Sequence, residues 1–314
     1  MDSRDLILNF ARENGINIVS DGDLDGIFAS GLLLRGLNLC GLEAGLDAVS
    51  FPHPRSLLGM RVEGSFLIEL PPSKGLNYSG SNLLVDHHGG VSGILLYREE
   101  KVETYLKIDG KSVAEIVVKA LRLELSSEAL LLIDAVGKID QAVYDSKLVE
   151  DLHKAYRLEI SSPGMRVKVS GWVYNGSWRK IMEWASKAGE KWSLVEEKEK
   201  RLYEGRISLC DGIVYFTYDG FDPLEQAAMR GAMFRLEDEY KVVVAVRIEN
   251  GRPVSASIGT KGSVDLQPLF SKLESIGLSA GGRTNIGGVQ ISDLSLEGFM
   301  EMLRKALLEL GFCE

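Results

Sequence analysis

Three carboxylates stand at alternate positions directly after the short apolar stretch 16–19, in the sequence Asp21-Gly22-Asp23-Leu24-Asp25-Gly26. Like charges this close repel each other, and burying each one costs solvation energy unless a cation compensates. A helix N-terminus needs one capping aspartate, not three. An EF-hand loop begins in the same way, but its twelfth position here is Leu32 instead of Glu. The spacing therefore predicts a metal site at the end of a strand.

A second group of potential metal ligands follows a later apolar stretch, as Asp86-His87-His88 before the glycines 89–90. The chain has four histidines, and two of them stand here side by side. Imidazole and carboxylate are usual ligands of Mn²⁺, Zn²⁺ and similar cations. Taken alone, the motif is equally compatible with an exposed turn. Together with the aspartates at 21–25 it favours one shared metal centre.

Alternating short strands and helices must position these groups. The apolar patterns predict helices at 1–15, 27–37, 112–123 and 127–139, and strands at 16–19, 45–51, 65–70, 82–85, 94–97 and 104–108. This alternation is typical of an α/β domain with a mostly parallel sheet covered by helices on both faces. Ligands bind such a sheet at the carboxyl ends of its strands, which is where both polar groups stand.

The second half of the chain is richer in predicted strands and contains an unusual glycine cluster. We expect strands at 207–209, 214–218, 241–248, 253–259 and 289–291, and helices at 223–236, 264–275 and 296–310. The segment 279–288 is predicted to be a loop that binds an anion through exposed backbone N–H groups and an arginine. A flexible turn is the alternative. The candidate substrate-binding residues are Gly281, Gly282, Arg283, Gly287 and Gly288.

The predicted organisation is a catalytic domain at 1–190, a helical connector at 191–205 and a smaller α/β domain at 206–314. All four tryptophans, at 172, 178, 184 and 192, lie in the helical segment 142–192 among basic residues. Aromatic and basic side chains together can stack bases and contact phosphates. They can also form a small core or a surface for a protein partner at 172–192, and we favour these interpretations over base stacking.

Composition restricts the class of protein. The hydrophobic fraction of 45% and the charged fraction of 26% are those of an ordinary globular protein. No apolar run reaches the roughly 18 residues that suggest a membrane span, and we expect no signal peptide. The three cysteines are isolated, without metal or disulfide spacing, so we expect a cytoplasmic setting. A net charge of −9 argues against non-specific coating of nucleic acid.

The motifs Asp-x-Asp-x-Asp-Gly and Asp-His-His, followed by the glycine-rich segment, resemble those of the DHH phosphoesterases, most closely the RecJ-like single-strand exonucleases of archaea. The resemblance extends over essentially the whole chain. It departs from the family pattern at two positions. Glu69 stands where the family has an aspartate that bridges two metal ions, and Arg283 stands at the histidine of the family's Gly-Gly-Gly-His loop. The substitution at 69 raises the question of full catalytic competence.

The resemblance implies a two-metal site, with two Mn²⁺ ions expected and Mg²⁺ as the alternative. Asp21 and Asp23 would bind one ion, and Glu69 would lie between the two. The residues assigned to the second ion are Asp25, His87 and Asp140, with Asp134 as the alternate of Asp140. His88 would face the scissile phosphate, and Asp86 would orient a neighbouring group.

The implied function is a metal-dependent phosphodiester hydrolase. It would be an exonuclease of DNA repair that acts on single-stranded DNA or RNA, held in a cleft between the two domains, by means of a metal-activated water. The first alternative is a phosphodiesterase of nano-RNA or dinucleotides. The second is a catalytically weakened scaffold protein of replication or repair, an interpretation that the glutamate at 69 favours. The sequence leaves open both the choice of DNA or RNA and the polarity of degradation.

Overall fold

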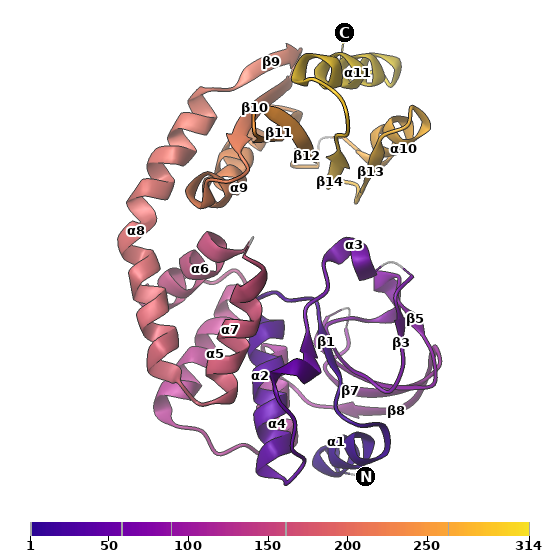
Figure 1. Ribbon diagram of the computed structural model, residues 1–314, viewed down its shortest axis with the longest axis vertical. Coiled ribbons are helices and arrows are strands. Elements are labelled where there is room, and N and C mark those ends of the chain that lie inside the picture. Colours follow the sequence, from indigo (N-terminus) through magenta and orange to yellow (C-terminus); the bar gives the residue numbers. More distant parts are fainter. Residues whose placement is uncertain (1, 58, 89, 161, 263, 314) are drawn as a thin grey trace. The chain divides into compact units, whose positions relative to one another are not determined.

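The computed structural model describes residues 2–57, 59–88, 90–160, 162–262 and 264–313. The chain divides into two compact units, an N-terminal unit of residues 1–189 and a C-terminal unit of residues 190–314. The helix α8, Trp178–Glu204, begins in the first and ends in the second (Figure 1). The predicted connector, 191–205, corresponds to the second half of this helix and extends one residue beyond its end. None of the described helices is both long and apolar enough to cross a membrane.

Two helices and a short strand open the N-terminal unit. Helix α1, Ser3–Asn14, is capped by the side chain of Asp2 and ends at Gly15, whose φ of 81° lies in the left-handed region. Strand β1, Ile18–Ser20, leads into α2, Leu24–Leu39, which is buried along most of its length. This is the β-α unit that the sequence predicted, with the helix starting three residues earlier because Asp23 caps it.

The sheet of the N-terminal unit has the strand order β2-β1-β4-β6-β7-β8. Its remaining strands are β2 Val49–Ser50, β4 Phe66–Ile68, β6 Ser81–Asp86, β7 Gly93–Arg98 and β8 Lys101–Lys107. The first four strands in this order are parallel, and β7 and β8 continue the sheet antiparallel. The predicted α/β class is confirmed. The expected strand at 45–51 is reduced to two residues because 46–48 form a 3₁₀ turn.

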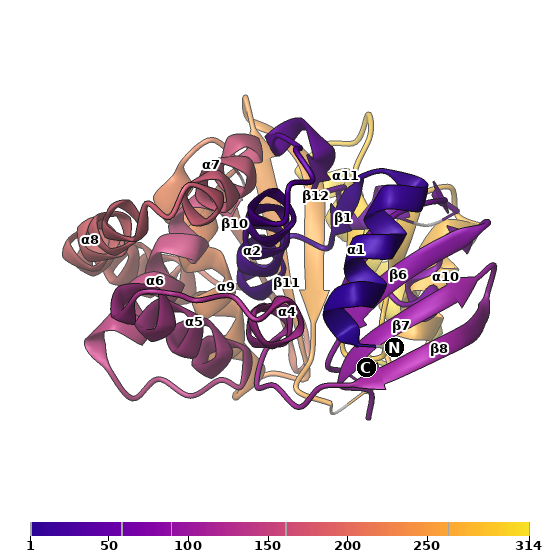
Figure 2. The ribbon, with the colours of Figure 1, turned by 90° about the horizontal axis from the view of Figure 1, so that it is seen from below.

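Each strand presents alternate side chains to the two faces of this sheet. Ile18, Phe66 and Leu83 pack against α1, α2 and α4 (Val113–Leu121) on one face. In Figure 2, α2 and α4 lie side by side and α1 lies nearer to β6 and β7. On the other face Val19 and Leu67 belong to a second apolar cluster, covered by the strand pair β3 (Arg61–Val62) and β5 (Asn77–Tyr78) and the one-turn helix α3 (Pro54–Leu57). Short elements in the connections at 51–65 and 69–80 thus cover this face, and the described residues place no long helix there, contrary to the expectation of helices on both faces.

The helix predicted at 127–139 is α5, Ser127–Asp140. The predicted helical segment 142–192 consists of α6 Lys147–Glu159, α7 Pro163–Tyr174 and the start of α8. Trp178 and Trp184 are buried in the main core, and Trp172 packs against it. The indole N–H of Trp184 donates to Glu159 Oε1 at 2.8 Å. These three tryptophans therefore form part of the core, the first of the interpretations drawn from the sequence.

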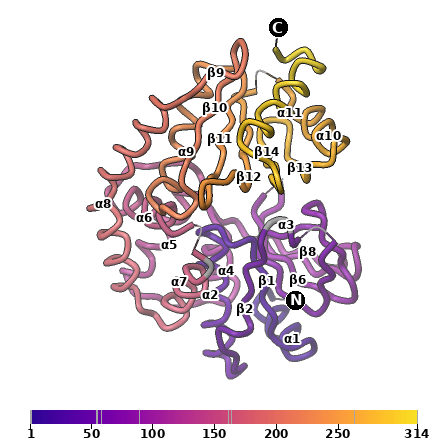
Figure 3. The backbone as a smooth tube through the Cα atoms, turned by 45° about the horizontal axis from the view of Figure 1, so that its top comes forward, coloured from indigo at the N-terminus to yellow at the C-terminus, as the bar shows by residue number. Residues whose placement is uncertain are grey.

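The C-terminal unit contains a second sheet, with the order β13-β14-β12-β11-β10-β9. Its strands are β9 Ile207–Cys210, β10 Ile213–Asp219, β11 Val242–Glu249, β12 Arg252–Gly259, β13 Ser279–Gly282 and β14 Ile286–Gln290. Helix α9, Pro223–Glu237, connects the parallel pair β10 and β11 and packs beside them (Figure 1). Helices α10, Gln267–Ser275, and α11, Leu296–Glu309, cover the opposite face, with α10 next to β13 (Figure 3).

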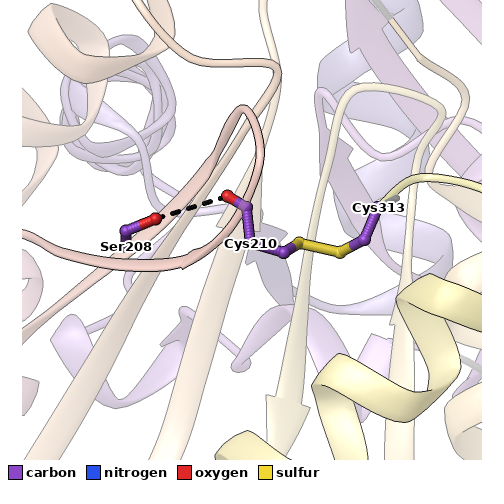
Figure 4. The surroundings of a disulfide bond; sticks show 3 residues. All are labelled: Ser208, Cys210 and Cys313. Carbon is purple, nitrogen blue, oxygen red and sulfur yellow. Dashed lines mark hydrogen bonds between the residues drawn. A yellow bond between two sulfur atoms is a disulfide. The ribbon is translucent and has the colours of Figure 1, made fainter.

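A disulfide joins Cys210, at the end of β9, to Cys313, with a Cα–Cα distance of 5.8 Å (Figure 4). Cys40 is free. The expectation that the cysteines are isolated is therefore wrong for this pair. They are 103 residues apart, so their spacing carries no local signal, and only the packing of α11 beside β9 brings them together.

Candidate metal centre

The carboxyl ends of β1, β4 and β6 lie side by side, because Ser20 pairs with Ile68 and Ile68 pairs with Val85. The next residue of each strand therefore leaves the sheet at the same edge. Two groups of ligand atoms form there, each with all its atoms within 4.8 Å of one another. One group is Asp21, Asp23 and Glu69, and the other is Glu69, His87, His88 and Asp140. Glu69 is common to both.

Glu69 is fully buried, and neither of its carboxylate oxygens has a hydrogen-bond partner. Its φ of 58° is unusual for a residue with a side chain and carries backbone strain. Burial, followed by the charges of Asp23 and Asp25, raises the pKa of Glu69 well above its usual value. A buried carboxylate without a partner is strongly destabilising unless a positive charge compensates. The surroundings of Glu69 therefore fit a bound cation on either side of it.

His87 lies at the centre of the second group. Its Nε2 is 3.3 Å from Glu69 Oε1 and 3.4 Å from Asp140 Oδ2, and it has no hydrogen-bond partner. Burial lowers the pKa of His87, which favours the neutral imidazole that binds metals. Asp140, the last residue of α5, is thus placed at the site. Asp134 is more exposed and pairs with Lys111 and Lys138 instead.

Asp86 holds the two histidines in place. Its buried Oδ1 accepts hydrogen bonds from the backbone N–H groups of His87 at 2.8 Å and His88 at 3.0 Å, and lies 3.1 Å from His88 Nδ1. Asp86 belongs to neither ligand group. His88, whose side chain is 57% exposed, is also only 3.4 Å from Glu69 Oε1. Gly89, part of the Gly-Gly turn in the sequence motif, lies outside the described residues.

The loop that carries the first two aspartates is fixed at Gly22. Asp23 uses Oδ1 to cap α2 through the N–H of Gly26 at 2.8 Å, and burial followed by the charge of Asp21 raises the pKa of Asp23 to about 6. The Gly22 carbonyl accepts from Arg166 Nε at 2.7 Å and from the Tyr156 hydroxyl at 3.4 Å. A Cβ at Gly22 would lie 2.7 Å from Arg166. Helices α6 and α7 therefore determine where this loop lies.

Asp25, expected among the metal ligands, belongs to neither group, although its Oδ2 lies 3.8 Å from His87 Nε2 at the site. Its two oxygens accept hydrogen bonds from the first N–H groups of α4, those of Val113 at 2.6 Å and Ala114 at 2.9 Å. A helix N-terminus has free N–H groups and attracts a negative charge. Burial is the main cause that raises the pKa of Asp25 to about 8. The partners are nearly ninety residues away in the sequence, so no local pattern could indicate this contact.

Lys74 is a residue of the site that the sequence did not single out. It is the last residue of the 3₁₀ turn Pro72–Lys74, and its Nζ lies 2.9 Å from Asp21 Oδ2. The only available sign was its position shortly after the strand that ends at Glu69. Lys74 brings a positive charge to the ligand group of Asp21, Asp23 and Glu69.

The glycine-rich segment is a β-hairpin, not the loop that we expected. Gly281 pairs with Gly288 and Gly282 with Gly287, and β14 also pairs with β12. The N–H groups of β14 therefore face neighbouring strands and are not free to bind an anion. A Cβ at Gly287 or Gly282 would lie within 2.2 or 2.8 Å of the Phe270 ring, so close packing requires these glycines. Arg283 is exposed at the turn of the hairpin.

The chain matches no protein-family model and no curated protein sequence. Its fold is similar to that of exonuclease RecJ bound to manganese, with a TM-score of 0.56, 13% identity, and coverage of 99% of this chain and 93% of that one. It is also similar to the pGpG-specific phosphodiesterase PggH from Vibrio cholerae, with a TM-score of 0.52, 14% identity, and coverage of 95% and 99%. RecJ from Thermus thermophilus in complex with Mn²⁺ has a TM-score of 0.50 and 14% identity, with coverage of 98% and 54%. The RecJ-like fold that the motifs predicted is thus confirmed.

Proposed function

We propose that this protein is a metal-dependent phosphodiesterase that hydrolyses single-stranded DNA or RNA from an end. The observation that carries the proposal is the buried carboxylate of Glu69, which has no hydrogen-bond partner and is common to two groups of potential metal ligands. The fold similarity to an exonuclease and a dinucleotide phosphodiesterase supports nucleotides as the class of substrate.

Two Mn²⁺ ions are the proposed cofactors. The donors are carboxylate oxygens and imidazole nitrogens, and no cysteine belongs to either group. This donor set suits Mn²⁺, and Mg²⁺ is the alternative. When bound, two such ions supply a nucleophilic water near neutral pH and offset the charge of the phosphate.

The side chains of the chain itself have distinct roles in this proposal. Glu69 contributes to both metal positions, and Asp86 orients His87 and His88 through three contacts to one oxygen. His88 has a side chain that is 57% exposed, against 10% for His87. We therefore assign His88 to contact with the substrate phosphate and His87 to metal binding.

Hydrolysis of dinucleotides or very short RNA is the second candidate function. Trp172, Trp178 and Trp184 are part of the core, so the aromatic platform that would favour a long strand is absent from these positions. PggH, which the chain resembles over nearly its full length, is a pGpG-specific phosphodiesterase. A purely structural scaffold is less well supported, because a scaffold has no need of an unpaired buried carboxylate such as Glu69.

Hydrolysis assays with Mn²⁺ test the proposal. Single-stranded DNA and RNA labelled at either end, and pGpG, are incubated with the full chain, with chelator as the control. We expect stepwise shortening of a single strand from one end. Cleavage of pGpG alone would support the second candidate, and no cleavage of any substrate would contradict both.

Metal binding is tested separately by calorimetry on three proteins. The wild type should bind two Mn²⁺ ions. Glu69→Gln removes the charge at similar size and should lose affinity, whereas Glu69→Asp restores the aspartate of the resembled family and should retain both ions. One Mn²⁺ per chain in all three proteins, without hydrolysis, would favour the scaffold interpretation.

A further inference from the structure

The two ligand groups differ in the positive charge that accompanies them. Lys74 Nζ lies 2.9 Å from Asp21 Oδ2, with side-chain exposures of 34% for Lys74 and 19% for Asp21. Among the described residues, no lysine or arginine forms an ion pair with Glu69, His87, His88 or Asp140. One metal position therefore already contains a monovalent counter-ion from the protein, and the other does not.

An ammonium group and a divalent cation cannot share the outward oxygen of Asp21 without strong repulsion. At a separation of a few ångströms, two like charges near a protein surface repel each other strongly. The other oxygen of Asp21, Oδ1, faces the backbone N–H of Asp23 at 3.5 Å, so Oδ2 is the oxygen directed away from the loop. A metal ion that binds Asp21 through Oδ2 must displace Lys74.

Lys74 can leave without a change in the backbone. Its N–H donates to Pro71 O at 2.9 Å, and the turn is followed by Gly75 with a φ of 85°. These contacts hold the main chain, whereas the long side chain is one-third exposed and has several rotatable bonds. Displacement therefore needs only a rotation of this side chain toward solvent.

On the basis of the metal centre proposed above, we infer that Lys74 is a built-in counter-ion that makes the two metal positions fill in order. The position formed by Glu69, His87 and Asp140 fills first. The position formed by Asp21, Asp23 and Glu69 fills second, at higher metal concentration, because Lys74 competes for it. The protein thus passes through a one-metal form whose range of metal concentration is set by Lys74.

Calorimetric titration of the full chain with MnCl₂ tests this order. The variants are Lys74→Met, which removes the charge, and Lys74→Arg, which keeps it. Lys107→Met is the matched control, because Lys107 is 68% exposed and pairs only with the exposed Asp109. We expect two unequal dissociation constants in the wild type. In Lys74→Met the dissociation constant of the more weakly bound Mn²⁺ should fall by about tenfold, which is the effect of one charge-assisted contact at a partly exposed site. The dissociation constant of the more tightly bound Mn²⁺ should not change.

Lys74→Arg and Lys107→Met should both retain the wild-type difference between the two Mn²⁺ dissociation constants. Electron paramagnetic resonance provides a second readout, since the signal of an exchange-coupled Mn²⁺ pair should appear at a lower metal concentration in Lys74→Met. If the dissociation constant of the more weakly bound Mn²⁺ is unchanged in Lys74→Met, the inference is overturned, but the proposal of a metal centre is not. Loss of the second ion in this variant would also overturn the inference, because it would make Lys74 a support of that position. Failure of all four proteins to bind Mn²⁺ would overturn the inference and the metal centre together.

Discussion

The metal centre and the glycine hairpin both stood out in the sequence, but the fold accounts for only one of them. The hairpin glycines 282 and 287 are explained by the ring of Phe270, which leaves no space for a side chain. The fold does not explain the residues of the metal centre in this way, because Glu69 and His87 contain buried polar atoms without hydrogen-bond partners. An unusual cluster of residues therefore indicates a ligand most clearly where packing and hydrogen bonding within the fold leave it unsatisfied.

Loss of one proposed metal ligand should give the largest effect. We predict that Asp23→Ala or His87→Ala lowers the hydrolysis rate by more than about 100-fold, since even residues that merely orient metal ligands often have effects of this size. Stability in urea should change little in His87→Ala and fall by about 1 kcal/mol in Asp23→Ala, which also loses the N-cap of α2. The matched control Asp134→Ala removes an exposed carboxylate outside both groups and should remain active. Wild-type rates in metal-reconstituted Asp23→Ala and His87→Ala would contradict the assignment.

Arg283 decides whether the hairpin has a function beyond its fold. If Arg283 binds a substrate phosphate, Arg283→Ala should raise KM by roughly tenfold or more, as expected for loss of a charge-assisted contact of about 1.5–3 kcal/mol. The dependence of KM on salt should also become weaker. Steady-state kinetics on a single-stranded oligonucleotide measure both. A KM equal to that of the wild type would show that the hairpin is only a structural element.

The packing of the hairpin is tested by paired glycine substitutions. Gly287→Ala would place a Cβ 2.2 Å from Phe270 Cζ, whereas nothing lies within 4 Å of a Cβ at Gly281. We predict that Gly287→Ala destabilises the protein by about 1–3 kcal/mol, the usual cost of overpacking, and that Gly281→Ala has little effect. Urea unfolding compares the two. Equal stabilities would show that Phe270 moves aside freely.

The buried carboxyl groups at the metal centre should determine the direction in which the stability of the metal-free protein changes with pH. The pKa of Asp25 is raised to about 8 in the folded protein, against about 3.9 in an unfolded chain. The folded state therefore holds this proton more tightly, and stability without metal should fall as pH rises from about 4 to about 8. The pKa values of His87 and His153 are lowered in the folded protein. These two groups make stability rise with pH, but only below about pH 6.5.

Thermal unfolding in chelator, recorded between about pH 6.5 and 9, measures this slope. The melting temperature should decline until about pH 8. Above this pH the contribution of Asp25 no longer changes, because its carboxyl group is then ionised in both the folded and the unfolded state. Added Mn²⁺ should reduce the decline, because bound cations compensate the carboxylates once they are ionised. A melting temperature that rises through this range in chelator would contradict the proposed electrostatics.

Local patterns predicted much of the fold and the main polar groups of the site. The first β-α unit and the strand that ends at Asp86 follow from residues close together in sequence. The parallel register of β1, β4 and β6 then brings Asp21, Glu69 and Asp86 to one edge. The sequence could supply these features because each depends on hydrophobic periodicity and on a general rule of sheet topology.

Contacts between distant segments could not be predicted in this way. Asp25 was expected only as a metal ligand, yet both of its carboxylate oxygens also accept hydrogen bonds from the start of α4, far along the chain. The contact between Lys74 and Asp21 and the disulfide between Cys210 and Cys313 also join residues that are far apart in the sequence. In the glycine segment, four glycines suggested an anion-binding loop, and the pairing of β14 with both neighbours was decided by the whole sheet. Tertiary packing outweighed local propensity in each case.

The left-handed backbone at Glu69 has an evolutionary consequence. Glycine would adopt the φ of 58° without strain and would remove a buried, unpaired carboxylate, so the fold by itself gains nothing from glutamate here. A descendant of this protein released from selection for hydrolysis should therefore drift to glycine or asparagine at this position before its other strand ends change. The identity of this single residue would then record, from one lineage to the next, whether the metal centre is still in use.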